Sequence, residues 1–157
     1  MKQPVSWKDR DMTISHVGIV WNPSKTTRED LENSWREAVA QTAEPRVSWF
    51  ETSKDDPGRG AAQGALEAGA DVVVAAGGDG TVRAVAEYLA EKNADVDLGI
   101  VPLGTGNLLA RNLDVPLDDP AAALARVLVS QSRAIDVGWA ELALDSGSER
   151  HAFVVMA

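Results

Sequence analysis

Short apolar runs rich in β-branched residues alternate with segments of helical periodicity along most of this chain. Residues 14–21, 47–51, 71–76 and 98–102 have the composition of strands, and the three valines at 72–74 suit a strand buried on both faces. Such alternation is typical of a parallel sheet with helices on both faces. We therefore predict an α/β fold, a three-layer α/β/α sandwich with a mainly parallel sheet.

Helix signals fill the segments between these strands. Thr26 and Glu29 have the spacing of a capping box, and apolar residues follow at helical spacing as far as Thr42. Asp56 followed by proline has the pattern of a second N-cap, and Gly69 that of the helix stop. Further helices are predicted after residue 81, at residues 108–112 and in an alanine-rich segment that ends near residue 129.

The alternation of strands and helices stops near the end of the chain. Residues 135–144 and 152–156 have the composition of strands, and residues 145–148 have that of a turn between them. Two strands joined by a hairpin break the strand–helix alternation. We therefore expect a flexible segment at 1–12, one α/β domain at 13–134, and at 135–157 the first strands of a truncated, β-rich second domain.

Composition excludes several classes of site and partner. The chain has 24 acidic and 15 basic residues and a net charge of -9, which argues against nucleic acid as a partner. Without cysteine it has neither disulfides nor thiolate metal sites. No run approaches the roughly 18 apolar residues of a membrane span, and residues 1–12 lack a secretory apolar region. We expect a cytoplasmic location.

A glycine loop, Gly77-Gly78-Asp79-Gly80-Thr81, lies where the most apolar strand gives way to a helix. Ligands bind at this end of strands in open parallel sheets, and helix amides hold phosphates there. Thr81 has a hydroxyl to donate, whereas an ionised Asp79 is suited to orienting loop amides or binding a metal. The structural alternative is a tight turn in which Asp79 only caps the helix.

A second loop, Gly104-Thr105-Gly106-Asn107, occupies the equivalent position after the next strand. Loops after neighbouring parallel strands share one edge of the sheet, so the two are predicted to face one crevice. Neither has the Gly-Lys-Ser/Thr of a P-loop nor the Gly-x-Gly-x-x-Gly fingerprint. Together they favour a phosphate-bearing ligand.

The two loops resemble those of a known family. Val-Ala-Ala-Gly-Gly-Asp-Gly-Thr-Val, followed by Pro-Leu-Gly-Thr-Gly-Asn-Leu-Leu-Ala-Arg-Asn-Leu, is similar to the catalytic domain of the diacylglycerol and sphingosine kinases. That family shares its nucleotide-binding fold with NAD kinases and 6-phosphofructokinases. The resemblance covers nearly the whole chain, because Asn22-Pro23, Thr52, Ile135-Asp136-Val137-Gly138 and the strand at Phe153 fall in the family's order.

The resemblance implies an ATP site with Mg²⁺. It implies nucleotide contacts from Asn22, Thr52, Gly77, Gly78, Asp79, Gly80, Thr81, Thr105, Gly106 and Asn107. Asp136 would support the site through a water or metal network. Arg83 departs from the family pattern, because many members have Asn-Glu where this chain has Arg83-Ala84, and its guanidinium is a candidate to meet a phosphate instead. For each of these there is a plainer alternative, in which Asn22 ends a strand, Thr52 caps a turn, Asp136 lies at a strand edge and Arg83 is solvated. The other cations near the loops, Lys25, Lys54, Arg59 and Arg111, are expected mostly in solvent.

The function implied is transfer of the ATP γ-phosphate to a lipid hydroxyl, as in diacylglycerol kinases, at a membrane surface. Asp79 would be the catalytic residue of this domain, with the general base in the second domain, so the chain alone would bind ATP weakly without turnover. Two alternatives stay open: an NAD kinase-like small-molecule kinase and a non-catalytic nucleotide-binding module. An exposed strand edge at 152–156 leaves a homodimer open as well.

Overall fold

The computed structural model describes residues 14–40, 42–129, 136–144 and 147–155, with backbone only in the last two ranges. Four parallel strands form the main sheet: β1 (His16–Trp21), β2 (Arg46–Glu51), β3 (Val72–Gly77) and β4 (Asp97–Pro102). Their order across the sheet is β2-β1-β3-β4. The chain therefore builds outward first to one side of β1 and then to the other, as in doubly wound sheets.

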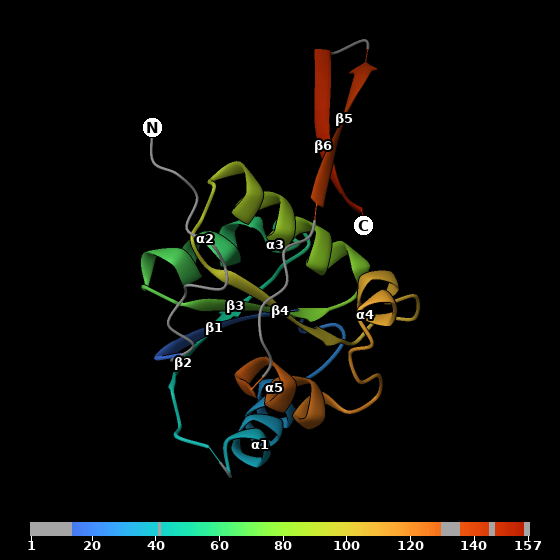
Figure 1. Cartoon of the computed structure of the whole chain (residues 1–157). Helices are drawn as coiled ribbons and strands as arrows, with labels where there is room; N and C mark the ends of the chain where they lie inside the picture. The colour runs from blue at the N-terminus through green and yellow to red at the C-terminus, as the bar shows by residue number, and fades with distance from the viewer. Residues whose placement is uncertain (1–13, 41, 130–135, 145–146, 156–157) are drawn as a thin grey trace.

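Helices cover both faces of this sheet (Figure 1). α1 (Arg28–Val39) and α5 (Pro120–Val129) pack on one face, and α2 (Arg59–Glu67) and α3 (Asp79–Glu91) pack on the other. α4 (Leu108–Asn112) is a short helix that follows β4. The predicted three-layer α/β/α arrangement is confirmed for this part of the chain.

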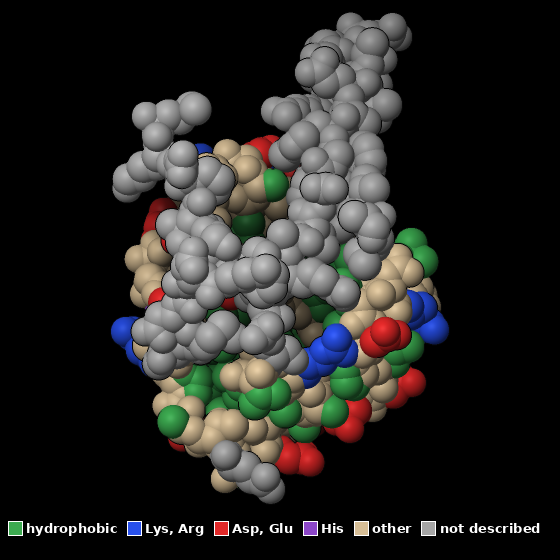
Figure 2. Space-filling view, in the orientation of Figure 1, with side chains coloured by type: hydrophobic (Ala, Val, Ile, Leu, Met, Phe, Trp, Pro, Cys, Tyr) green, Lys and Arg blue, Asp and Glu red, His purple; other side chains and the backbone are tan. Residues whose placement is uncertain are grey.

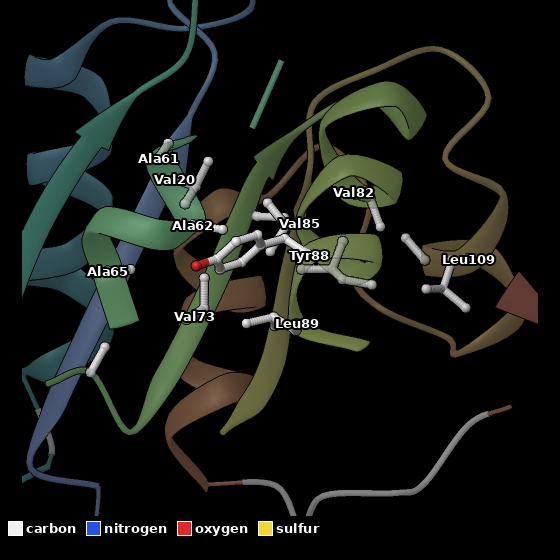
Figure 3. Packing of buried hydrophobic residues seen from close by; sticks show 14 residues of the cluster. Val20, Ala61, Ala62, Ala65, Val73, Val82, Val85, Tyr88, Leu89 and Leu109 are labelled. Atoms are coloured by element: carbon white, nitrogen blue, oxygen red, sulfur yellow. The ribbon is translucent and has the colours of Figure 1, made fainter. Parts of the chain in front are cut away.

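The strand side chains divide the core into two clusters, one on each face of the sheet. Ile19 and Val74 point toward α1 and α5, whereas Val20 and Val73 point toward α2 and α3. Figure 3 shows the ring of Tyr88 reaching from α3 toward Val73 and α2. Full burial of one valine stabilises a fold by about 1.5–3 kcal/mol, so the paired strands at the centre anchor the domain.

Several predicted helix boundaries were wrong. Thr27, not Thr26, is the N-cap of α1, where its hydroxyl oxygen accepts from the Asp30 amide at 3.1 Å, and the helix ends at Val39, before Thr42. α2 begins at Arg59 because residues 53–56 form a closed turn first. The carboxylate of Asp56 nevertheless accepts from the amides of Gly58, Gly60 and Ala61 at 2.8–3.2 Å.

The end of α2 and the last strands were predicted with mixed success. Gly69 has a φ of +87° directly after the helix, as expected of a C-terminal stop. β5 (Asp136–Leu144) and β6 (Gly147–Val155) pair antiparallel, so the hairpin is present. The second strand begins at Gly147, inside the predicted turn, because the ladder continues to the Leu144–Gly147 pair. The flexible segment at 1–12 and the boundary at 134 lie outside the described residues.

Candidate nucleotide site

A pocket of about 350 Å³ lies where the carboxyl ends of the four parallel strands meet. Each strand contributes through the residues that follow it: Asn22 after β1, Thr52 after β2, Gly78 after β3 and Gly104 after β4. Backbone hydrogen bonds align these ends, with the Thr52 amide donating to the Trp21 carbonyl at 2.9 Å. The pocket thus occupies the switch point between β1 and β3, where the direction of chain winding reverses.

Most of the predicted nucleotide residues line this pocket. They are Asn22, Thr52, Gly78, Asp79, Gly80, Thr81, Thr105 and Gly106. Their side chains differ in exposure: Thr52 and Thr81 are each 4% exposed, whereas Asp79 and Thr105 are exposed. Eight predicted residues, drawn from positions 22 to 106, therefore line one cavity.

Three of the predicted site residues that the structure describes, Gly77, Arg83 and Asn107, are not part of the pocket lining. Gly77 is the last residue of β3 and lies beneath Thr81, whose hydroxyl oxygen is 2.6 Å from the position that a Cβ on Gly77 would take. Asn107 is 8% exposed and faces its own loop. Arg83 is an exposed residue of α3, and Asp136 lies in β5, where side chains fall outside the described residues.

Four residues of the pocket were not predicted as ligands: Lys25, Ser53, Pro57 and Gly104. Lys25 had been expected in solvent. It lies in a turn after β1 in which the Asn22 side-chain oxygen accepts from the amide and hydroxyl of Ser24, and the Lys25 amide donates to the Asn22 carbonyl at 3.0 Å. The sequence did contain a signal for Lys25 as a pocket residue, because it comes just after a strand and therefore lies at the same edge of the sheet as the glycine loops.

Two other cations expected in solvent have partners. The Arg111 side chain donates through Nε to the carbonyl oxygen of Gly106 at 2.7 Å, which fixes part of the second glycine loop. Arg59 pairs with Glu91 across α2 and α3 and lies over the Tyr88 ring. Hydrogen bonding to Glu91 raises the pKa of Arg59 above its usual range, so this guanidinium stays charged.

The first glycine loop opens directly into α3. Gly78 is the N-cap, and the Val82 amide donates to its carbonyl at 3.1 Å. The amides of residues 79–81 precede the first intrahelical bond, and the positive end of the helix dipole lies beside them. A Cβ on Gly80 would meet nothing within 4 Å, so open space lies above these amides. The loop has the features of an anion cradle.

The two glycine loops touch each other. A Cβ on Gly104 would lie 2.7 Å from the Cα of Gly78, so only glycine permits this approach of backbones. Asn107 has a φ of +50°, and its side chain both accepts from the Gly104 amide at 3.0 Å and donates to the Gly104 carbonyl at 2.8 Å. The Asp79 carboxylate accepts from the Leu108 amide at 2.9 Å.

The surface charges of the described residues are mixed in sign on one face of the molecule (Figure 2). On the face drawn in Figure 2, the described Asp, Glu, Lys and Arg side chains are interspersed rather than segregated. Within the described residues there is no group of three or more His, Asp or Glu side chains placed to hold a metal ion. The same residues contain no helix long and apolar enough to cross a membrane.

Comparison with known proteins identifies the family. The model of the diacylglycerol kinase catalytic domain matches residues 16–140. A protein of Pseudomonas aeruginosa named "Probable lipid kinase YegS-like" is 47% identical over 103 residues, which are 66% of this chain and 32% of that protein. A diacylglycerol kinase of Staphylococcus aureus is 32% identical over 122 residues, which are 76% of this chain and 38% of that protein.

Solved structures agree on the fold. The crystal structure of a diacylglycerol kinase from Bacillus anthracis superposes with a TM-score of 0.60 at 23% identity, and covers 86% of this chain and 49% of that one. The chain thus spans between 32% and 49% of the length of these relatives. Since the family model covers most of its residues, including both glycine loops, the chain belongs to the diacylglycerol kinase catalytic-domain family.

Proposed function

We propose that this chain is the nucleotide-binding part of an ATP-dependent lipid kinase, which transfers the γ-phosphate to a diacylglycerol-like lipid hydroxyl. The observation that carries the proposal is the pocket in which both glycine loops of the family meet the N-terminus of α3. Family membership favours a kinase over a sensing module, and the names of the relatives favour a lipid acceptor over NAD.

The residues present suit a polyphosphate. Open space above Gly80 leaves room for phosphate oxygens beside the first amides of α3, and Thr81 lines the same space. Lys25 also lines the pocket. Its positive charge offsets part of the repulsion that ATP meets from a chain of net charge -9. Thr52 and Ser53, which follow β2 at the edge of the sheet, extend the lining beyond the two glycine loops and leave a surface for the rest of the nucleotide.

The residues of this site are compatible with Mg²⁺ that binds together with the phosphates of ATP. Protein Mg²⁺ sites commonly use one or two carboxylates together with substrate phosphates, so the lack of a carboxylate cluster among the described residues does not disfavour it. Bound Mg²⁺ would neutralise charge on the transferring phosphoryl group. Among the described residues, Asp79 is the carboxylate that lines the pocket, but one of its oxygens already accepts from the Leu108 amide.

In the proposed reaction the lipid hydroxyl oxygen forms a bond to the γ-phosphorus while the bond from that phosphorus to the ADP oxygen breaks. The described residues supply positioning and part of the charge neutralisation. The hydroxyl proton must go to a base, which the resemblance assigns to the second domain. We propose that the lipid is met at a membrane surface, with the protein peripheral to it.

Calorimetric titration of the 157-residue chain with ATP, with and without Mg²⁺, tests the nucleotide site. Saturable binding that strengthens with Mg²⁺ is expected, with AMP binding more weakly because it lacks the β- and γ-phosphates. Gly80→Asp should abolish this binding because its carboxylate enters the phosphate space, while a negative charge in the first turn suits the helix. Asn33→Asp adds the same charge beside Arg36 on α1 and is the matched control.

Absence of binding at millimolar ATP, or equal binding by Gly80→Asp, would contradict a nucleotide site at this loop. The acceptor requires the longer protein that includes the second domain. Incubation of that protein with ATP and either diacylglycerol or NAD separates the two kinase alternatives. Phosphorylation of NAD alone would reject the lipid kinase proposal.

A further inference from the structure

The carboxylate of Asp79 crosses from the first glycine loop to the second. Its Oδ1 accepts from the Leu108 amide at 2.9 Å, a bond between residues 29 positions apart. Its Oδ2 stands against Gly106, since a Cβ on that glycine would lie 2.7 Å from this oxygen. Both oxygens therefore meet the loop that carries Thr105.

The other contacts of the second loop fix its shape but leave its outer end independent of the first loop. Asn107 bridges the amide and carbonyl of Gly104, and Arg111 binds the Gly106 carbonyl from the following helix. The two loops are also joined at their base, where the Leu103 amide donates to the Gly77 carbonyl at 2.9 Å. Asp79 adds a link at the opposite end of the loop, beyond Thr105 and Gly106.

An ionised carboxylate in a polyphosphate pocket calls for a physical explanation. It cannot donate to a phosphate oxygen, and its charge repels one. A carboxylate that accepts from a backbone amide forms a charge-assisted hydrogen bond, which is stronger than a neutral one. Asp79 gains this bond only if the second loop lies close to the first, so its carboxylate favours the arrangement that closes the pocket.

We propose that Asp79 is a positioning residue, which holds Thr105 and Gly106 against the nucleotide by accepting the Leu108 amide, and that this acceptor is what binding requires. The inference rests on the proposed function, because it assigns a role within the same site. It differs from a catalytic or metal-binding role, in which the negative charge itself would be needed.

Two substitutions separate these roles. Asp79→Asn keeps an oxygen acceptor of the same shape but removes the charge, whereas Asp79→Ala removes both. Asp119→Ala is the matched control, because the Asp119 Oδ1 likewise accepts a backbone amide, that of Ala122, at 3.0 Å near the start of α5 and outside this pocket.

Amide hydrogen exchange of the 157-residue chain without nucleotide tests the link itself. We expect the Leu108 amide to exchange about tenfold faster in Asp79→Ala than in the unmodified chain, and to stay protected in Asp79→Asn. Asp119→Ala should accelerate the Ala122 amide and leave that of Leu108 unchanged. Unaltered exchange of Leu108 in Asp79→Ala would overturn the inference while leaving the proposed function intact.

Calorimetry with ATP, with and without Mg²⁺, tests the consequence for binding. Asp79→Ala should weaken ATP binding about tenfold, the loss expected for one charge-assisted hydrogen bond. Asp79→Asn should retain affinity within about threefold, with the same strengthening by Mg²⁺. An Asn variant as weak as the Ala variant, or one that has lost the benefit of Mg²⁺, would overturn the inference. An unmodified chain that binds no ATP would reject the proposed function and this inference with it, whatever the exchange rates show.

Discussion

An aspartate lies near each end of β3, and both carboxylates accept hydrogen bonds from backbone amides, one in support of the fold and the other beside the pocket. Asp71 precedes the strand and accepts three hydrogen bonds on Oδ2, from the Ser15 amide at 2.9 Å, the Ser15 hydroxyl at 2.6 Å and the His16 amide at 2.9 Å. Asp79 follows the strand and accepts from the Leu108 amide while it also lines the pocket.

The difference separates stability from binding within one strand. At the amino edge one oxygen of the Asp71 carboxylate accepts from Ser15 and His16 at the start of β1, and Asp71 does not line the pocket, so these bonds serve the fold. At the carboxyl edge the loops are held mostly by backbone approach and a few polar contacts, which leaves the amides beside Gly80 open. Changes at the two ends are therefore expected to alter different measurable properties.

The largest effect is expected for Gly104→Ala, because the new Cβ would lie 2.7 Å from the Cα of Gly78 and neither backbone can yield easily. Overpacking of this kind costs about 1–3 kcal/mol of unfolding free energy, and it should also separate the loops and abolish ATP binding. Urea unfolding and calorimetry measure the two effects. Gly64→Ala on α2, whose Cβ would meet only the Phe50 side chain, should leave ATP binding unchanged. Normal binding by Gly104→Ala would refute the close approach of the loops.

Gly80→Ala should change stability and binding in opposite directions. The residue lies in the first turn of α3 with nothing within 4 Å of an added Cβ, so alanine raises the unfolding free energy by up to about 1 kcal/mol. The methyl group enters the phosphate space, and ATP affinity should fall about tenfold, by roughly 1.4 kcal/mol. Thermal unfolding and calorimetry on the same preparation report both. A loss of stability together with unchanged affinity would show that the cradle lies elsewhere.

Asp71→Asn should lower stability by about 1 kcal/mol at pH 7, a value reduced by solvent screening, and should leave ATP binding intact. Hydrogen bonding from the Ser15 hydroxyl holds the pKa of Asp71 below its ordinary value of 3.8. A lowered folded-state pKa means that the stabilisation is complete above pH 3.8 and disappears as pH falls through the folded value. In urea titrations from pH 7 downward, the stability difference between the two proteins should be constant above pH 3.8 and should narrow as pH falls below it. Ser15→Ala should reduce this pH dependence, and a difference that does not narrow below pH 3.8 would contradict the assignment.

Arg83→Ala should have the smallest effect. Arg83 is exposed on α3 and does not line the pocket, so both the unfolding free energy and ATP affinity should stay close to their original values, within about 0.5 kcal/mol. A tenfold loss of affinity in calorimetry would instead support the sequence-based hypothesis that this guanidinium meets a phosphate.

The fold was predictable because its signals are local and repeated. The valines at 72–74 and the glycine loops after two successive strands fix the order of elements, and the common edge of a parallel sheet then brings Asn22 and Thr52 beside them. Helix starts were less predictable. Thr26 and Thr27 each have an acidic residue three positions later, so the sequence pattern alone does not choose between them.

The contacts that shape the site could not be predicted, because they depend on the approach of distant backbones. The pairing of Asp79 with Leu108 joins residues 29 positions apart, and no spacing rule connects them. Asn107 is buried within its own loop and has a φ of +50°. Asparagine tolerates this left-handed conformation, but the sequence alone does not show which asparagine adopts it. Lys25 was misjudged because a surface lysine is usually solvated.

All pairings in the main sheet are parallel, which bears on when the pocket can exist during folding. The residues of β1 meet those of β3 across a separation of 55 positions, as Val17 pairs with Val72, and β4 joins last along the chain. Such distant pairings slow folding because chain closure precedes the contacts that offset its entropy. Since all four strand ends must be in register first, a partly folded chain has no pocket to occupy. A ligand of this pocket therefore retards unfolding of the finished sheet without hastening its assembly.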